Sequence, residues 1–111
     1  MTIEQSTIAL VITTFDDSLA ADEFSARLLD EGLIACVNRV GPVMSSYHWQ
    51  GELCRDEEYQ LHMKTALDRV NDLKAAIERL HPYDCPEVIV LEAGSSQPYS
   101  QWVQQCVRTA D

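Results

Sequence analysis

The sequence predicts a single α+β domain, a ferredoxin-like βαββαβ sandwich with an extra C-terminal helix. The length of 111 residues, with 46% hydrophobic and 23% charged residues, matches one globular domain spanning residues 1–111. Apolar runs and helical stripes follow one another in the order strand, helix, strand, strand, helix, strand and helix. Right-handed crossovers then place both main helices on one face of a four-stranded antiparallel sheet.

The first strand and the first helix are predicted at residues 7–14 and 19–31. The strand segment is an uninterrupted apolar run with β-branched residues, a composition that favours a buried strand over a helix. The polar residues 16–18 that follow it are competing N-caps for the helix. Gly32 stands where a left-handed C-terminal cap is usually found.

Two further strands form a predicted hairpin. The first covers residues 33–40, is interrupted by Gly41-Pro42 and resumes at 43–49. Because proline has no N–H for the ladder, a bulge or bend is expected at the interruption. A turn at 50–52 leads to the second strand at 57–65, in which apolar and polar residues alternate strictly. This alternation assigns one apolar and one polar face to the strand.

The last third of the chain contains a helix, a short strand and a final helix. The helix at 69–80 has an apolar stripe, a candidate N-cap in Asp68 and a stop signal in Pro82. The strand is predicted at 88–91 and the final helix at 98–107. The stripe of the final helix that is expected to pack against the domain consists of Tyr99, Trp102, Val103, Cys106 and Val107.

Two helices on one face leave the opposite face of the sheet without cover. Exposed apolar faces and free strand edges are normally covered in stable proteins. A domain of this size also has a large surface for its volume, so burial between subunits would stabilise it. The sequence therefore predicts a homo-oligomer.

The chain is strongly acidic, since its 18 acidic and 8 basic residues give a formal net charge of −10. A surface of this charge repels nucleic acid and anionic membranes, so neither is an expected partner. The same charge is compatible with metal cations and with a simple role in solubility.

The expected location is the cytoplasm. No apolar run reaches the ~18 residues of a membrane span, and the first six residues lack the basic region of a secretory signal. The four cysteines are widely spaced and form no C-x-x-C pair; they are Cys36, Cys54, Cys85 and Cys106. This pattern favours reduced thiols over two disulfides.

The segment from His81 to Glu87 is the strongest candidate site. Two prolines stiffen it, and imidazole, phenol, thiol and carboxylate groups occur within its seven positions. Such mixed ligands suit a soft or borderline ion such as copper or zinc. In the alternative interpretation Pro82 ends the helix, His81 caps its carbonyl groups and Pro86 starts an edge strand. The residues alone favour neither interpretation.

No catalytic motif is present, and no nucleophile is recognisably paired with a base, so the protein is not expected to be an enzyme. Glu58 and Lys64 are expected to form an ion pair across the polar strand face or to contact a small molecule. Trp49 and Trp102 are expected to pack in the core or in an interface.

Several stretches together resemble the CutA1 family of divalent-cation tolerance proteins, and they cover nearly the whole chain. They are Ala35-Cys36-Val37-Asn38, Tyr47-His48-Trp49-Gln50-Gly51, Glu58, Lys64-Thr65, His81-Pro82-Tyr83, Pro86-Glu87 and Trp102. The resemblance implies a ferredoxin-like subunit in a tight, P-II-like homotrimer, in which strands of adjacent subunits pair edge to edge. It also implies a link to tolerance of copper and other divalent metals.

The resemblance implies a metal ligand at His81. Two further ligand positions of a bacterial member, a histidine and a cysteine, are occupied here by Leu80 and Thr13. Cys85, in the same loop as His81, is a hypothetical replacement. The expected cofactor is therefore copper or another divalent metal ion, held at His81 and Cys85.

A second interpretation places a small organic or anionic ligand in a cleft between subunits, as in a P-II-like sensor. The residues assigned to this cleft are Trp49, Glu58, Lys64, His81 and Tyr83. Lys64 would supply a cation and the aromatic side chains a stacking surface. The tight turn at 50–52 counts against this interpretation, because a P-II-like protein would use a long flexible loop for partner contacts.

Overall fold

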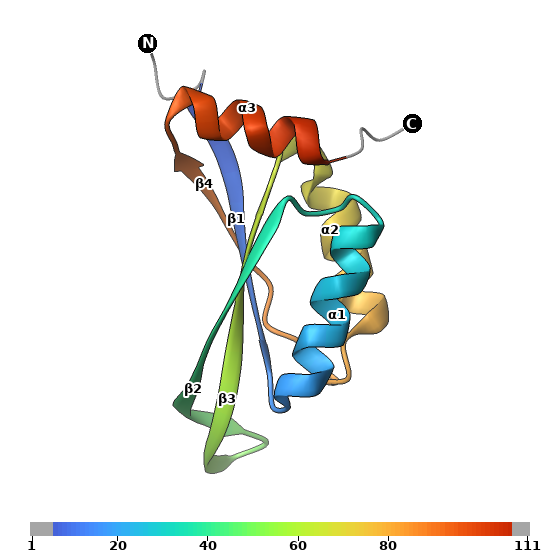
Figure 1. Cartoon of the computed structure of the whole chain (residues 1–111). Helices are drawn as coiled ribbons and strands as arrows, with labels where there is room; N and C mark the ends of the chain where they lie inside the picture. Colours follow the sequence, from blue (N-terminus) through green and yellow to red (C-terminus); the bar gives the residue numbers. More distant parts are fainter. Residues whose placement is uncertain (1–5, 108–111) are drawn as a thin grey trace.

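A computed structural model, which describes residues 6–107, confirms the α+β ferredoxin-like fold. Its four strands form one antiparallel sheet in the order β2-β3-β1-β4. The elements are β1 (Thr7–Phe15), α1 (Ser18–Asp30), β2 (Cys36–Trp49), β3 (Glu52–Thr65), the 3-10 turn η2 (Leu67–Arg69), α2 (Val70–Leu80), β4 (Ile89–Gly94) and α3 (Gln97–Cys106). Figure 1 shows α1 and α2 together on one side of the sheet, and α3 across the end where β1 begins.

The hydrophobic core lies between the sheet and these two helices. Alternate residues of β1 face the helices, so that Ala9, Val11 and Phe15 are almost completely buried. The side chains that pack against them come from β3 and from the helices, and they include Leu61, Met63, Ala21, Phe24, Leu28, Leu73, Ala76 and Ile77. The predicted alternation of β3 and the apolar stripe of α2 are therefore confirmed.

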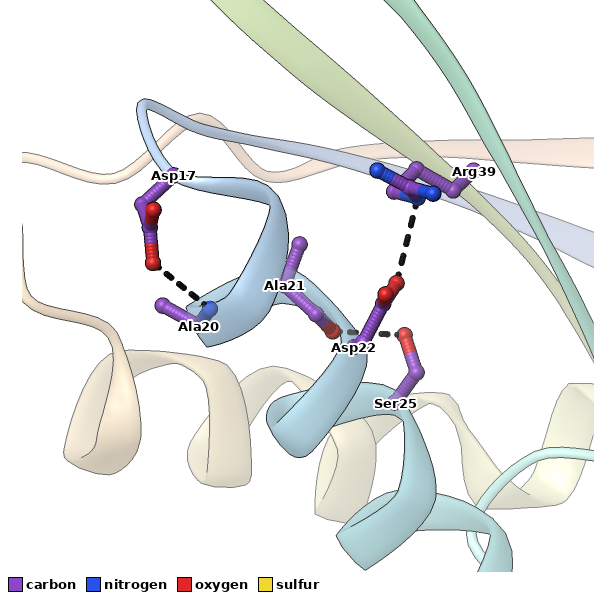
Figure 2. Close-up of polar contacts among 6 residues, drawn as sticks. All are labelled: Asp17, Ala20, Ala21, Asp22, Ser25 and Arg39. Carbon is purple, nitrogen blue, oxygen red and sulfur yellow. Dashed lines mark hydrogen bonds and ion pairs between the residues drawn. The ribbon is translucent and has the colours of Figure 1, made fainter.

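The two core helices begin differently. Of the candidate caps at residues 16–18, Asp17 is the one used, and its carboxylate accepts a hydrogen bond from the Ala20 amide at 2.9 Å (Figure 2). The prediction that Asp68 caps the second helix is wrong. The chain enters α2 through η2, which contains Asp68, and Arg69 stands at the N-cap position without a side-chain cap bond.

Gly41 forms the predicted bulge in β2. The register of β2 against β3 shifts between Val40 and Val43, and the Gly41–Pro42 peptide bond is cis. Gly41 has a φ of +139°, and a Cβ atom there would lie 2.9 Å from the carbonyl oxygen of Glu58. Because only glycine allows both this φ and this close approach, Gly41 sets the position of β3 at Glu58.

The β2–β3 hairpin is longer than predicted. β3 already begins at Glu52, and its pairing with β2 extends to Trp49. The two turn residues, Gln50 and Gly51, both have positive φ, as a type I′ turn requires. Because β1 ends at Phe15, the outer half of the hairpin projects beyond the rest of the sheet (Figure 1).

The expected packing of α3 is only partly correct. Trp102 is 44% exposed and Cys106 is also exposed, so neither belongs to the core of the subunit. The side chains of α3 and its C-cap that are buried are Ser100, Val103 and Val107. The helix crosses the end of the sheet (Figure 1), and these buried side chains form a narrow stripe along it.

The sheet face opposite α1 and α2 carries exposed apolar side chains, as predicted. Ile89 and Leu91 of β4 are 45% and 46% exposed. They pair with Ile12 and Leu10 of β1, which alternate with the core residues of that strand. We call these four residues the β1–β4 patch. It lies beside a strand edge, because β4 is an outer strand of the sheet.

Candidate functional site

A cleft opens beside the outer half of the β2–β3 hairpin. The segment from Tyr83 to Glu87, which connects α2 with β4, forms one wall, and the hairpin and the end of β1 form the others. Its volume is about 860 Å³. We call it the hairpin cleft.

The hairpin cleft is strongly acidic. Six carboxylates line it, and within the part of the chain that the structure describes no lysine, arginine or histidine does so. The six are Asp16, Asp56, Glu57, Glu58, Asp84 and Glu87. Like charges around a partly enclosed space concentrate cations and repel anions. The electrostatics of the cleft therefore favour a cationic ligand.

Aromatic side chains and one thiol complete the chemistry of the cleft. Tyr47, Trp49 and Tyr83 line it. The hydroxyl of Tyr47 donates a hydrogen bond to Asp56, and this bond is the main reason that the pKa of Tyr47 is raised to about 12. Cys85 has a free, exposed thiol and is the one cysteine among the lining residues. A thiolate is a soft ligand that suits copper or zinc.

Glu58 is the most unusual of the carboxylates, because it is only 8% exposed. Its Oε2 accepts a hydrogen bond from the Tyr83 hydroxyl at 2.6 Å. Burial, followed by this bond, raises the pKa of Tyr83, so the phenol stays protonated and remains a donor. A charge-assisted bond of this length holds Glu58 in one orientation.

His81 is also only 8% exposed, and both of its ring nitrogens are engaged. Nδ1 accepts a hydrogen bond from the backbone N–H of Tyr83 at 3.1 Å, and Nε2 lies 2.8 Å from the carbonyl oxygen of Thr14. Since a carbonyl can only accept, Nε2 carries the proton. Burial lowers the pKa of His81, which keeps the ring neutral. The imidazole packs against Phe15 at a centroid distance of 4.3 Å.

Thr14, which is bonded to His81 through its carbonyl oxygen, is also bonded to a second carboxylate of the cleft. Its hydroxyl donates a hydrogen bond to Oε2 of Glu87 at 3.0 Å. Four hydrogen bonds therefore link Glu58, Tyr83, His81, Thr14 and Glu87, in which Tyr83 and Thr14 each use one backbone group and one side-chain hydroxyl.

Several residues singled out from the sequence meet in the hairpin cleft, namely Trp49, Glu58, Tyr83 and Cys85. Lys64 lies elsewhere on β3, and its ammonium group donates a hydrogen bond to Asn38. The expected Glu58–Lys64 ion pair is wrong, because Glu58 is bonded to Tyr83 instead. The assignment of Lys64 to a cleft between subunits stays a prediction.

The sequence pattern singles out half of this acidic lining, namely Glu58 and the two carboxylates of the segment from His81 to Glu87. It indicates Asp16 only as a helix cap and does not single out Asp56 and Glu57. The signal that could have found them is the run Asp56-Glu57-Glu58 in a chain of net charge −10.

One chain does not present a complete metal site. Among residues 6–107, no group of three or more His, Cys, Asp and Glu side chains is arranged to hold a metal ion. Thr13 is completely buried, and Leu80 supplies no ligand atom. A metal ion could bind His81 only by displacing one of its two hydrogen bonds. The role of His81 and Cys85 as ligands stays a prediction.

Residues 9–106 match the family model described as CutA1 divalent ion tolerance protein. The divalent-cation tolerance protein CutA of Thermus thermophilus is 35% identical over 97 residues, which are 86% of this chain and 94% of that protein. The CutA protein of Thermotoga maritima is 32% identical over 99 residues, with coverages of 88% and 97%.

Solved structures agree with these sequence matches. The crystal structure of CutA1 from Oryza sativa superimposes with a TM-score of 0.88 at 30% identity, covering 94% of this chain and 96% of that one. The PII-like protein CutA from Nostoc sp. PCC 7120 gives a TM-score of 0.86 at 31% identity, with coverages of 92% and 99%. In the described part of the present chain, no helix is long and apolar enough to cross a membrane.

Proposed function

Because this chain belongs to the CutA1 divalent ion tolerance protein family, we propose that it binds divalent metal cations in the hairpin cleft. The observation that carries this proposal is the lining of six carboxylates and a free thiol without a basic side chain among the described residues. Carboxylates attract any divalent cation, whereas the Cys85 thiolate favours softer ions. The expected preference is therefore for copper or zinc over magnesium.

The proposed ligands are Cys85 and neighbouring carboxylates of the cleft. Since the described residues of one chain do not form a complete ligand set, coordination is completed when the segment from Tyr83 to Glu87 moves or when another copy contributes. We propose a homotrimer. The support for subunit contacts is the β1–β4 patch, which exposes apolar side chains beside a strand edge.

A small-molecule ligand is the second candidate. It is favoured by Tyr47, Trp49 and Tyr83, whose rings offer stacking surfaces, and by the similarity to a PII-like CutA protein. Because the cleft is acidic, the expected small-molecule ligand is an organic cation and not an anion. Aromatic faces and carboxylates both attract ammonium groups.

We infer a binding role in the cytoplasm for this protein rather than an enzymatic one. All four cysteines are free, and free thiols persist in reducing compartments. Within the described residues, no histidine lines the cleft to act as a base for Cys85, which argues against thiol catalysis.

The test is calorimetric titration of the protein with Zn²⁺ and Mg²⁺, together with the absorption spectrum of the Co²⁺-loaded form. We expect Zn²⁺ to bind more tightly than Mg²⁺, and Co²⁺ to show a thiolate charge-transfer band. Cys85→Ser should abolish the band, whereas Cys106→Ser, which removes an exposed thiol outside the cleft, should keep it. A wild-type protein that binds none of these ions contradicts the proposal.

The oligomeric state is tested separately by sedimentation. A homotrimer should have about three times the subunit mass of 12.5 kDa. Leu91→Lys, which places a charge in the β1–β4 patch, should shift the protein toward smaller species. A wild-type monomer at micromolar concentration contradicts the trimer.

A further inference from the structure

The outer half of β3 has one edge to which no described strand is paired. β2 pairs with β3 along residues 52–64, whereas β1 pairs with β3 only along residues 59–65. Among residues 6–107, no backbone hydrogen bond from a turn or loop reaches residues 52–58 either. We call the side of residues 52–58 that faces away from β2 the open β3 edge. At ~3.4 Å per residue it is roughly 23 Å long.

Three residues direct backbone groups outward along the open β3 edge. In an antiparallel ladder, successive residues direct their N–H and C=O groups alternately to the two sides of the strand. The two-residue turn makes Trp49 and Glu52 a hydrogen-bonded pair, so the even-numbered residues of β3 face β2. The bond from the Ala35 N–H to the Lys64 carbonyl, at 2.8 Å, follows the same alternation. The residues with outward backbone groups are therefore Leu53, Arg55 and Glu57.

The open β3 edge borders the hairpin cleft. Asp56, Glu57 and Glu58 line the cleft, and Thr14 at the end of β1 lines it as well. The hairpin extends past the end of β1 (Figure 1). The cleft therefore begins where β1 stops, at the place that a longer neighbouring strand would occupy.

The charges of the open β3 edge determine which strand suits it. Free strand edges tend to pair with other strands, and charged side chains control this pairing. Residues 52–58 contain four acidic side chains and one arginine. Within the described residues, no basic side chain lines the cleft. Two copies of such an edge repel each other, whereas opposite charges on paired strands attract. The complementary occupant is therefore a basic strand and not a second copy of this edge.

We propose that the open β3 edge binds an extended, basic segment of a partner protein as an added antiparallel strand. This binding goes beyond the proposed metal binding and requires no metal ion. Backbone hydrogen bonds to the edge supply affinity, and alternate side chains of the segment supply specificity. Residues directly opposite each other share a face, so the positions opposite Asp56 and Glu58 favour lysine or arginine. The position between them is opposite Glu57. The position opposite Leu53, which is 69% exposed, favours an apolar residue.

The probe is the fluorescein-labelled heptapeptide Thr-Lys-Val-Lys-Val-Lys-Thr, and its binding is measured by fluorescence anisotropy in EDTA. The matched peptide Thr-Glu-Val-Glu-Val-Glu-Thr keeps the alternation and reverses the charge. We expect the lysine peptide to bind with an affinity that falls as salt is added, and the glutamate peptide not to bind. Equal binding of both peptides, or no binding of the lysine peptide, overturns the proposal. Because EDTA removes metal ions, this result is independent of whether the protein binds Zn²⁺.

Two N-methylated peptides separate strand pairing from simple charge attraction. When the lysines lie opposite Asp56 and Glu58, the N–H groups of the valines point to β3 and those of the lysines point away. N-methylation of both valines should weaken binding at least about tenfold, because two backbone hydrogen bonds are lost and the close approach of the strands is blocked. N-methylation of two lysines should leave the affinity unchanged. Equal affinities of the two methylated peptides contradict strand addition.

Amide hydrogen exchange of the wild-type protein, followed by NMR, locates the bound peptide. The lysine peptide should slow exchange at Leu53, Arg55 and Glu57, whose N–H groups would be bonded to it. The control amides are Ser46 and His48, which point outward from the opposite edge of the same hairpin and should be unaffected. Slower exchange at these two amides instead would place the peptide on β2 and overturn the proposal.

One pair of variants tests the charge of the edge. Asp56→Asn should weaken binding of the lysine peptide, because it removes a carboxylate opposite a lysine. Asp68→Asn removes an exposed carboxylate of η2, outside the cleft lining, and should bind as the wild type does. Equal losses in both variants would show a response to net charge alone and contradict the proposal. Circular dichroism checks that both variants fold, and the methylated peptides decide with the wild-type protein if one does not.

Discussion

Replacement of Gly41 by alanine tests whether the bulge positions the functional site. Gly41 has a φ of +139°, which costs an alanine roughly 1–3 kcal/mol. In addition, the new Cβ would lie 2.9 Å from the Glu58 carbonyl oxygen and 3.3 Å from the Tyr59 Cα, both of them backbone atoms. Forcing atoms into such a packed site costs a further ~1–3 kcal/mol. The expected total is therefore about 2–6 kcal/mol.

Gly51→Ala is the matched control. Gly51 also has a positive φ, +83°, but a Cβ there meets nothing within 4 Å. The expected cost of Gly51→Ala is therefore only that of the unfavourable backbone conformation, about 1–2 kcal/mol. Comparison of the two variants at equal protein concentration isolates the steric contribution at Glu58, since any oligomer makes the melting temperature depend on concentration.

The assay combines thermal unfolding, followed by circular dichroism, with Zn²⁺ titration. Gly41→Ala should melt below Gly51→Ala and should also bind Zn²⁺ less tightly, because the clash displaces Glu58 from its bond with Tyr83. The reasoning is refuted if the two variants differ by less than about 0.5 kcal/mol, the usual effect of a neutral surface substitution.

Three further results are expected. Burial holds the pKa of His81 in the folded protein below 6.5, so the imidazole is protonated in the unfolded chain before it is protonated in the folded one. The free energy of unfolding in urea should therefore fall as the pH drops below about 6.5. His81→Gln should show a smaller fall, and an equal fall would contradict the lowered pKa of His81. Trp102→Ala should cost about 1–2 kcal/mol, below the ~3–5 kcal/mol of a buried tryptophan, and a cost in that higher range would show that another copy covers this side chain. Lys64→Ala should leave Zn²⁺ affinity unchanged, whereas a loss of Zn²⁺ binding would show that Lys64 contributes to the site.

The strands and core helices could be predicted because their signals are local. The alternation at 57–65 specifies which side chains of β3 face the core, and the stripe of α2 specifies its buried side. The prediction of Asp68 as the N-cap of α2 is wrong because capping depends on more than the apolar pattern. A cap depends on the exact residue at which helical geometry begins, and an intervening 3-10 turn does not change the apolar pattern.

The site was only partly predictable. The mixed chemistry of the segment from His81 to Glu87 is visible in the sequence, and Glu58, Tyr83 and Cys85, which the sequence singles out, line the hairpin cleft. The partner of Glu58 was not predicted, because the alternation of β3 places Glu58 on the same face as Lys64. The Tyr83 hydroxyl bonds to Glu58 beyond the end of β1, where β1 no longer pairs with β3.

The sequence by itself determined the order of the elements, the sides that the core helices bury and the acidic character of the molecule, because these depend on neighbouring residues and on composition. Only the tertiary structure decided that His81 faces inward, bonded to Thr14 and Tyr83, and that carboxylates from three segments surround one cleft. The physical reason is that hydrogen bonds across 67 residues of chain depend on where the sheet brings distant backbone atoms together.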